Sequence, residues 1–257
     1  MKIAIVTGAS SGMGREFVVQ VQHLYSSLDE VWVVARRQDR LEALVEDSKV
    51  TMRIFCGDLQ KKPVYAQIAK VLKEENPDIR MLVNAAGFGK NGTVEEILER
   101  EEDAQEQMID LNCKGLTKMT LLCLPYMKKG ARIVNLASAA AFCPQPHFAV
   151  YAATKAYVLS FSRGLGAELK EKGIYVTAVC PGPVETEFFK VSGHVGGKLK
   201  KAVMVKPGPV VKRALQDARA GRPLSIYGTT MKGTALATKV IPHDVFLKLE
   251  TTDLFRM

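Results

Sequence analysis

The stretch Thr7-Gly8-Ala9-Ser10-Ser11-Gly12-Met13-Gly14 decides the fold of this chain. It follows the apolar run Lys2–Val6, which is typical of a buried strand, and a helical pattern over Met13–Ser27 opens within it. Gly8 permits a tight turn, Gly12 lets the backbone approach a pyrophosphate, and Gly14 lets helix and strand pack closely. Because glycine marks many tight strand-to-helix turns, the dinucleotide-binding interpretation depends on the rest of the chain.

Beyond this stretch, short β-branched runs alternate with longer helical segments. The alternation predicts an α/β, Rossmann-like fold: a doubly wound parallel sheet of seven strands with helices on both faces. Most predicted strands are continuously apolar, as strands covered on both faces must be. The predicted strands are Lys2–Val6, Glu30–Ala35, Val50–Phe55, Arg80–Asn84, Arg132–Ala137, Ile174–Cys180 and Leu224–Tyr227. The predicted helices are Met13–Ser27, Asp39–Asp47, Pro63–Glu75, Ile97–Lys128, Tyr151–Lys172 and Pro209–Ala220.

No linker, repeat or shift in composition divides the chain, so we expect one Rossmann-type domain over residues 1–257. Pro181–Lys206 shows no regular pattern and contains a lysine cluster: Lys198, Lys200, Lys201 and Lys206. A patternless stretch of this length is usually functional or mobile, so residues 183–206 are predicted to form a substrate lid, with a solvated loop as the alternative. Residues 229–257 form a C-terminal extension beyond the last predicted strand.

Composition excludes several classes of protein. With 257 residues, 47% hydrophobic and 25% charged, the chain is neither collagenous nor disordered, and no uncharged apolar run approaches a membrane span. The net charge of +9 would suit an anionic partner, or simply keep the protein soluble. Five cysteines lie far apart without a C-x-x-C pair, and no Asp/Glu/His cluster has metal-ligand spacing, so we expect no metal. The strand at the N-terminus leaves no room for a signal peptide, and a cytoplasmic location is predicted.

Further motifs stand in register with the glycine stretch. Asp58 follows the third predicted strand, and Asn84-Ala85-Ala86-Gly87 follows the fourth. Asn112, Ser138, Tyr151 and Lys155 come next, and then Pro181-Gly182 with Thr186. With these motifs the chain resembles the classical short-chain dehydrogenase/reductase family over nearly its whole length. The resemblance implies a nicotinamide dinucleotide cofactor bound by Gly8, Ser10, Ser11, Gly12, Met13, Gly14, Arg36, Arg37, Asp58, Leu59, Asn84, Ala85, Gly87, Tyr151, Lys155, Pro181, Gly182, Val184 and Thr186.

The end of the second predicted strand indicates which dinucleotide binds. Enzymes specific for NAD place an acidic residue there, which bonds the ribose 2′-hydroxyl. This chain has Arg36 and Arg37 instead. Guanidinium groups bind a 2′-phosphate, and a carboxylate would repel it. NADP(H) is therefore the predicted cofactor, with Arg36 as the direct contact and Arg37 assisting or stacking on adenine; a solvated arginine pair is the alternative.

The reacting centre is predicted around Tyr151 and Lys155, which share one helix face because they lie four residues apart. A nearby ammonium is expected to lower the pKa of the phenol toward working pH, as a general acid/base requires. By resemblance, Tyr151 exchanges a proton with the substrate oxygen, Ser138 donates a hydrogen bond to that oxygen, and Lys155 also holds the nicotinamide ribose. Asn112 would support a water that links the lysine to solvent.

The predicted function is an NADPH-dependent oxidoreductase that interconverts a ketone and a secondary alcohol. Phe142 and Phe188 would join Ser138 and Tyr151 around an apolar substrate of hydroxysteroid or 3-oxoacyl type. The alternative is a non-catalytic NADP-binding regulatory protein, which would lack a catalytic side chain. A nucleic-acid partner is not expected because lysines do not interleave with aromatic residues. Membrane contact is not expected either, and the resemblance implies a homodimer, with a tetramer as the alternative.

Overall fold

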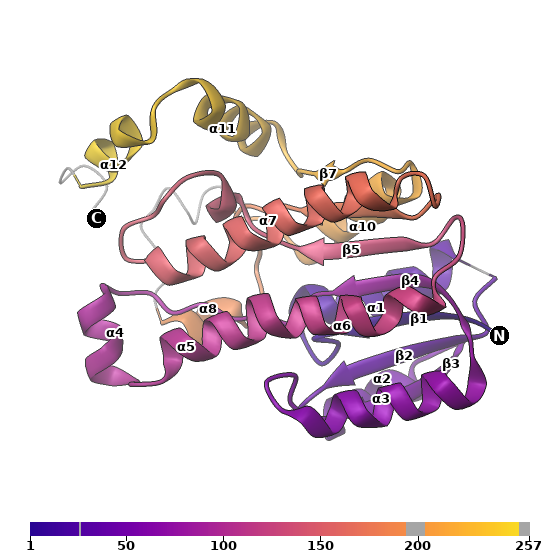
Figure 1. Ribbon diagram of the computed structural model, residues 1–257. Coiled ribbons are helices and arrows are strands. Elements are labelled where there is room, and N and C mark those ends of the chain that lie inside the picture. The colour runs from indigo at the N-terminus through magenta and orange to yellow at the C-terminus, as the bar shows by residue number, and fades with distance from the viewer. Residues whose placement is uncertain (26, 194–203, 252–257) are drawn as a thin grey trace.

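The computed structural model describes residues 1–25, 27–193 and 204–251. Its centre is one parallel sheet with the strand order β3-β2-β1-β4-β5-β6-β7, which confirms the predicted doubly wound topology (Figure 1). The order reverses between β1 and β4, and ligands of such sheets bind outside the carboxyl ends of strands at this switch point. The strands are β1 (Lys2–Thr7), β2 (Glu30–Ala35), β3 (Thr51–Cys56), β4 (Asp78–Asn84), β5 (Arg132–Leu136), β6 (Tyr175–Val179) and β7 (Leu224–Ser225).

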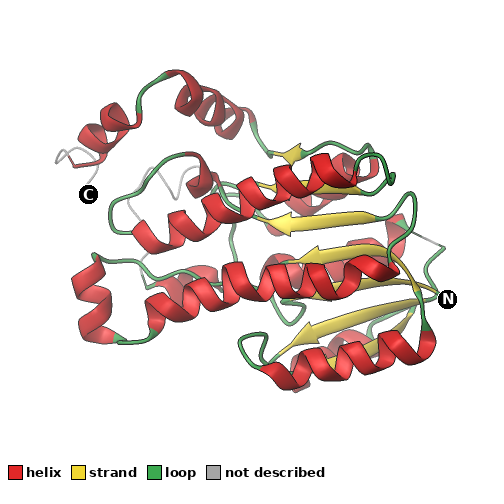
Figure 2. Cartoon of the chain, in the orientation of Figure 1, coloured by secondary structure: helices red, strands yellow, loops and turns green. Residues whose placement is uncertain are grey.

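Helices cover both faces of the sheet, as Figure 2 shows. Successive strand residues point to opposite faces. Ile3 and Ile5 of β1 therefore pack in the core under α3, α6 and α7, whereas Ala4 and Val6 pack in the core under α1, α2 and α10. These helices are α1 (Gly12–Leu24), α2 (Gln38–Glu46), α3 (Lys62–Glu75), α6 (Leu116–Cys123), α7 (Ala149–Leu169) and α10 (Pro207–Arg219). With both faces of the central strands buried, the ends of these strands are the parts of the sheet that a ligand can reach.

The prediction of one helix over Ile97–Lys128 is wrong. A capping box between Thr93 and Glu96 starts a separate helix, α4 (Val94–Arg100), and the chain leaves helical geometry at Glu101. The acidic run 101–103 has no apolar residue that could continue a buried stripe, so the chain turns there. It continues as α5 (Ala104–Ile109), the π-helix η1 (Asp110–Gly115), α6 and the short 3₁₀-helix η2 (Leu124–Tyr126).

Part of the stretch after Pro181, in which the sequence shows no regular pattern, has regular structure. Phe188–Ser192 forms the short helix α8, and Val184 makes a parallel bridge to Val205. The predicted lid residues Lys198, Lys200 and Lys201 lie outside the described residues.

The C-terminal extension forms two helices, α11 (Thr229–Val240) and α12 (His243–Thr251). In α11 only Ala235 is buried, while Leu236 and Val240 are 65% and 77% exposed. The extension therefore covers little of the core. Among the helices that the structure describes, none is long and apolar enough to cross a membrane.

The close approach of the β1–α1 turn gives a first prediction. A methyl group at Gly14 would lie 2.1 Å from the carbonyl oxygen of Gly8. Gly14→Ala must therefore push the helix from the strand, and we expect it to lower the free energy of unfolding by about 1–3 kcal/mol in urea titrations. Gly164→Ala is the matched control, because nothing lies within 4 Å of the added carbon. The control should be neutral or stabilising by up to ~1 kcal/mol, and equal losses in both variants would contradict the prediction.

Candidate active site

The glycine turn between β1 and α1 is shaped to receive an anion. Gly8 and Gly12 have φ angles of 68° and 52°, a backbone conformation that favours glycine. Ser11 caps α1 without a side-chain hydrogen bond, so the N–H groups of the first helical turn remain available to a ligand. Because the helix dipole also favours negative charge at this end, the turn fits a phosphate group.

A cavity of about 700 Å³ runs from this turn along the carboxyl edge of the sheet. That volume is typical of a site for a cofactor or small substrate. The cavity brings together nearly all of the residues that the sequence predicts to bind a dinucleotide. Lining it are Gly8, Ser10, Ser11, Gly12, Met13, Gly14, Arg36, Arg37, Asp58, Leu59, Ala85, Gly87, Tyr151, Lys155, Pro181, Gly182, Val184 and Thr186.

Asn84 is the exception, and its predicted place at the cofactor is not what the structure shows. Its side chain is 2% exposed and does not line the cavity. The amide nitrogen donates to Thr120 Oγ1 at 3.0 Å and to Asn135 Oδ1 at 2.9 Å. Asn84 thus joins β4 to α6 and β5 inside the protein through its amide nitrogen, whereas its Oδ1 has no hydrogen-bond partner among the described residues.

The two arginines after β2 have different surroundings. Arg36 is exposed, lines the cavity and has no side-chain hydrogen bond or ion pair within the described part of the chain. Arg37 donates to Ser10 Oγ through Nε at 3.3 Å and through Nη2 at 3.2 Å. A bound anion could therefore reach Arg36 without breaking any protein contact.

Three of the four predicted catalytic residues lie on one wall of the cavity: Ser138 after β5, and Tyr151 and Lys155 on α7. The Lys155 Nζ lies 5.7 Å from the centre of the Tyr151 ring and donates to the carbonyl oxygen of Leu136 at 2.8 Å. That carbonyl orients the ammonium, a role that side-chain motifs could not reveal. The Ser138 hydroxyl accepts a hydrogen bond from Ala140 N at 3.1 Å.

Asn112 lies behind this wall, 1% exposed, and does not line the cavity. It sits in the π-helix η1, an irregular turn that is frequent at functional sites. Its amide nitrogen donates to Phe88 O at 2.9 Å and Thr154 Oγ1 at 3.0 Å, and its Oδ1 accepts from Phe88 N at 3.0 Å. Thr154 in turn donates to the backbone oxygen of Tyr151 at 2.7 Å. Asn112 therefore ties the loop after β4 to the helix that carries Tyr151.

Burial determines the pKa values of Tyr151 and Lys155. Loss of solvation raises the pKa of Tyr151 to about 12, although the hydrogen bond from Ser138 acts in the opposite direction. Burial also lowers the pKa of Lys155 to about 8, against the smaller opposing influence of Cys113 and Cys180. The expectation that the phenol pKa is lowered toward working pH is therefore wrong for the protein alone: desolvation outweighs the hydrogen bond from Ser138, and at neutral pH the phenol keeps its proton.

The other end of the cavity is mainly apolar. The rings of Phe148 and Phe188 lie 5.5 Å and 5.3 Å from the Tyr151 ring, and Phe142 also lines the cavity. Sequence reasoning missed further lining residues, namely Lys90, Glu101, Gln145, Met231, Thr234, Thr238 and Phe246. The last four belong to the extension, whose weak pattern gave no signal of where α11 and α12 would lie.

Within the described residues, no group of three or more His, Cys, Asp or Glu side chains could hold a metal ion.

Comparison with known proteins identifies relatives of the chain. The sequence profile of the family described as short chain dehydrogenase matches residues 2–194. A 17-beta-hydroxysteroid dehydrogenase type 3 from Danio rerio is 31% identical over 202 residues, which cover 75% of this chain and 63% of the relative. A very-long-chain 3-oxoacyl-CoA reductase from Anas platyrhynchos is 33% identical over 197 residues, or 74% of this chain and 62% of the relative.

A solved structure resembles nearly the whole chain. It is a short-chain dehydrogenase from Sphingobium yanoikuyae in complex with NADPH, with a TM-score of 0.77 and 26% sequence identity. The superposition covers 98% of this chain and 97% of the other. The likeness therefore extends to the region beyond residue 194.

Proposed function

Because the chain belongs to the short-chain dehydrogenase family, we propose that it is an NADP(H)-dependent oxidoreductase that interconverts a ketone and a secondary alcohol on an apolar substrate. One observation carries this proposal. The cavity that begins at the glycine turn also contains Ser138, Tyr151 and Lys155 in its lining, so a dinucleotide and a carbonyl compound could meet in one cavity. The catalytic roles of these residues follow from their chemistry and from the family resemblance.

The residues at the glycine turn fit a dinucleotide. The pyrophosphate would lie against the N–H groups of the first turn of α1, and Arg36 would bind the ribose 2′-phosphate. When bound, NADP(H) supplies or accepts the hydride. The relative from Sphingobium yanoikuyae is in complex with NADPH, which supports this choice of cofactor.

The proton would be held by Tyr151. A phenol with a pKa of about 12 is a proton donor at neutral pH, which suits the reduction of a ketone. Ser138 would donate a hydrogen bond to the substrate oxygen and stabilise the negative charge that develops there. Lys155 keeps a positive charge beside the phenol while the pH stays below its pKa of about 8. Asn112 would act through the backbone of α7, as a positioning residue.

The substrate would lie among the aromatic side chains, with Phe142 and Phe188 against its apolar body. The hydroxysteroid dehydrogenase and the 3-oxoacyl-CoA reductase among the relatives support substrates of these two types. The predicted lid over residues 183–206 lies partly outside the described residues, and residues 229–251 of the extension would add a further wall. In this assignment the chain is one Rossmann-type domain over residues 1–257.

A homodimer is the assembly that the surface of the helices supports. Exposed apolar side chains lie on α4, α5, α6 and α7, the region through which the family resemblance implies dimer contact: Leu98, Ile109, Leu121 and Tyr157. Burial of these side chains against a second copy would remove apolar surface from water. The cytoplasmic location stays a prediction.

Substitution of Tyr151 by Phe tests the proposed chemistry. The change removes one hydroxyl, so folding and NADPH binding should survive while turnover falls by ~10²–10⁴-fold, the usual contribution of general acid catalysis. Turnover is measured by NADPH oxidation against a panel of ketones and 3-oxoacyl thioesters. Tyr175→Phe is the matched control, because this phenol is exposed on β6, outside the cavity. Normal turnover in Tyr151→Phe would place the proton donor elsewhere.

The pH profile tests the role of Lys155. Because the ammonium loses its proton as pH rises through about 8, kcat/KM for NADPH, which reports ionisations of the free protein, should decline above that value. A single ionisation gives a fall of up to about tenfold per pH unit. Lys155→Arg keeps its charge at every pH used and should lose this inflection, whatever its overall rate. A profile of the parent that stays flat to pH 10 would contradict the assignment.

Arg36→Ala tests the choice between the two cofactors. Because a charge-assisted contact contributes roughly 1.5–3 kcal/mol, kcat/KM for NADPH should fall by ~10–100-fold while the value for NADH stays nearly unchanged. Arg219→Ala removes the same charge from an exposed position at the end of α10, outside the cavity, and should change neither value. Equal losses with both cofactors would show that Arg36 does not bind the 2′-phosphate.

A further inference from the structure

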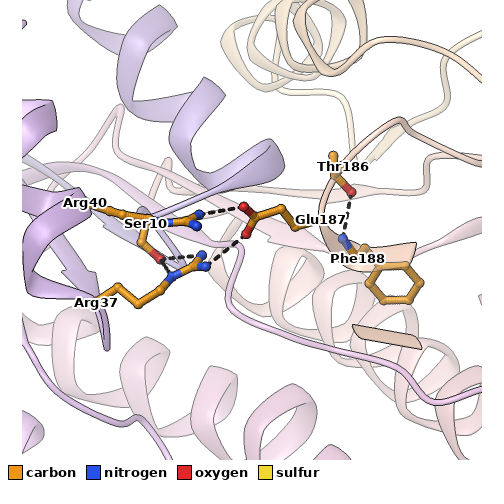
Figure 3. Close-up of polar contacts among 6 residues, drawn as sticks. All are labelled: Ser10, Arg37, Arg40, Thr186, Glu187 and Phe188. Atoms are coloured by element: carbon orange, nitrogen blue, oxygen red, sulfur yellow. Dashed lines mark hydrogen bonds and ion pairs between the residues drawn. The ribbon is translucent and has the colours of Figure 1, made fainter. Parts of the chain in front are cut away.

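A carboxylate lies between two guanidinium groups at the edge of the cavity. Arg37 Nη1 donates to Glu187 Oε2 at 2.9 Å, and Arg40 Nη1 donates to Glu187 Oε1 at 2.7 Å. Figure 3 shows Glu187 reaching both arginines, with Ser10 on the other side of Arg37. The partners lie 150 and 147 residues apart in the sequence. This contact therefore joins the turn after β2 to the residue that precedes α8.

The position of this cluster coincides with the proposed seat of the 2′-phosphate. Arg37 follows the exposed Arg36, Ser10 belongs to the glycine turn, and Arg37 and Glu187 both line the cavity. Guanidinium groups recognise carboxylates and phosphates through the same planar N–H···O geometry. Glu187 thus supplies, from within the chain, an anion of the kind that the cofactor would bring.

The contact can exchange with solvent. The side chains of Arg37, Arg40 and Glu187 are 40%, 40% and 37% exposed, and ion pairs this accessible contribute little to stability. Hydrogen bonds from Arg40 and Arg37 hold the pKa of Glu187 at about 2, so the carboxylate is charged at every working pH. It carries one negative charge, whereas a phosphate monoester carries almost two near pH 7. A 2′-phosphate is therefore the stronger partner for the arginines.

The same carboxylate is connected to the catalytic wall. Glu187 directly precedes Phe188, whose ring lies 5.3 Å from the ring of Tyr151. Phe188 N donates to Thr186 Oγ1 at 3.3 Å (Figure 3). The contacts of Glu187 with Arg37 and Arg40 therefore also hold the start of α8 near Tyr151.

We propose that Glu187 is a specificity-determining residue that competes with the ribose 2′-phosphate for Arg37 and Arg40. This inference rests on the proposed NADP(H) function. A dinucleotide with the phosphate displaces the carboxylate and frees the start of α8, whereas one without it leaves both ion pairs in place. Glu187 thus weakens binding of the phosphorylated cofactor alone, and Arg40, which no sequence motif indicates, becomes a further ligand for the phosphate beside Arg36 and Arg37.

The test compares Glu187→Gln with the parent by calorimetric titration of adenosine 2′,5′-bisphosphate and of 5′-AMP, which lacks the 2′-phosphate. Loss of two exposed ion pairs should tighten binding of the bisphosphate by roughly 2–10-fold. Binding of 5′-AMP should stay unchanged. Glu185→Gln is the matched control, because this exposed carboxylate lies two residues earlier and has no side-chain partner in the described part of the chain. The control removes the same charge and should leave both affinities unchanged.

Three results would overturn the inference. Equal affinities in Glu187→Gln and Glu185→Gln would mean that the carboxylate does not compete, and weaker bisphosphate binding in Glu187→Gln would mean that it supports the phosphate. A parent protein that binds neither NADPH nor the bisphosphate would overturn the proposed function itself, so the two failures are distinguishable. Thermal unfolding of each variant verifies the fold. If Glu187→Gln unfolds early, Glu187→Ser, which also removes the carboxylate, is titrated and interpreted in the same way.

Discussion

Burial of both sheet faces determines where this protein can place polar chemistry. Residues of β1 alternate between two apolar cores, so neither face of the strand offers a polar group to a ligand. Polar groups that must meet a ligand are confined to the edge where the strands end. The glycine turn follows β1, Arg36 follows β2, and Ser138 follows β5. The position of the cavity therefore follows from the burial of both sheet faces.

Buried polar side chains hold that edge in place from behind. Asn84 joins β4 to α6 and β5, and Asn112 joins the loop after β4 to α7. Unpaired polar groups are costly in a protein interior, so each of these amides is effective only when its partners stand at fixed positions. The same burial that orders the amides also removes solvent from Tyr151 and Lys155. Burial thus determines both the positions of the site's side chains and the pKa values of Tyr151 and Lys155.

The sequence predicts those features of the structure that depend on the pattern of neighbouring residues. Alternating strands and helices gave the topology, and the order of Ser138, Tyr151 and Lys155 placed three side chains on one wall. The break at Glu101 was missed because the acidic residues 101–103, which interrupt the apolar stripe, are also common on the solvent face of a long helix. Asn84 looked like a cofactor ligand because its motif follows a strand, yet its partners come from two other elements. The pKa of Tyr151 had the wrong predicted direction, since spacing reports the nearby charge but not the loss of water. Contact between Glu187 and two distant arginines has no local signature at all.

The wall of the cavity that comes from the extension has a different sequence origin from the rest. The family profile ends at residue 194, whereas Met231, Thr234, Thr238 and Phe246 line the same cavity as Tyr151. Only Ala235 is buried in α11, so few core contacts constrain what these positions can become. In the proposed function, substrate range and hydride chemistry would therefore reside in different parts of the chain: the extension could change toward a new substrate while the residues around Tyr151 remain as they are. Exchange of residues 229–257 between relatives is accordingly a natural route to redesign.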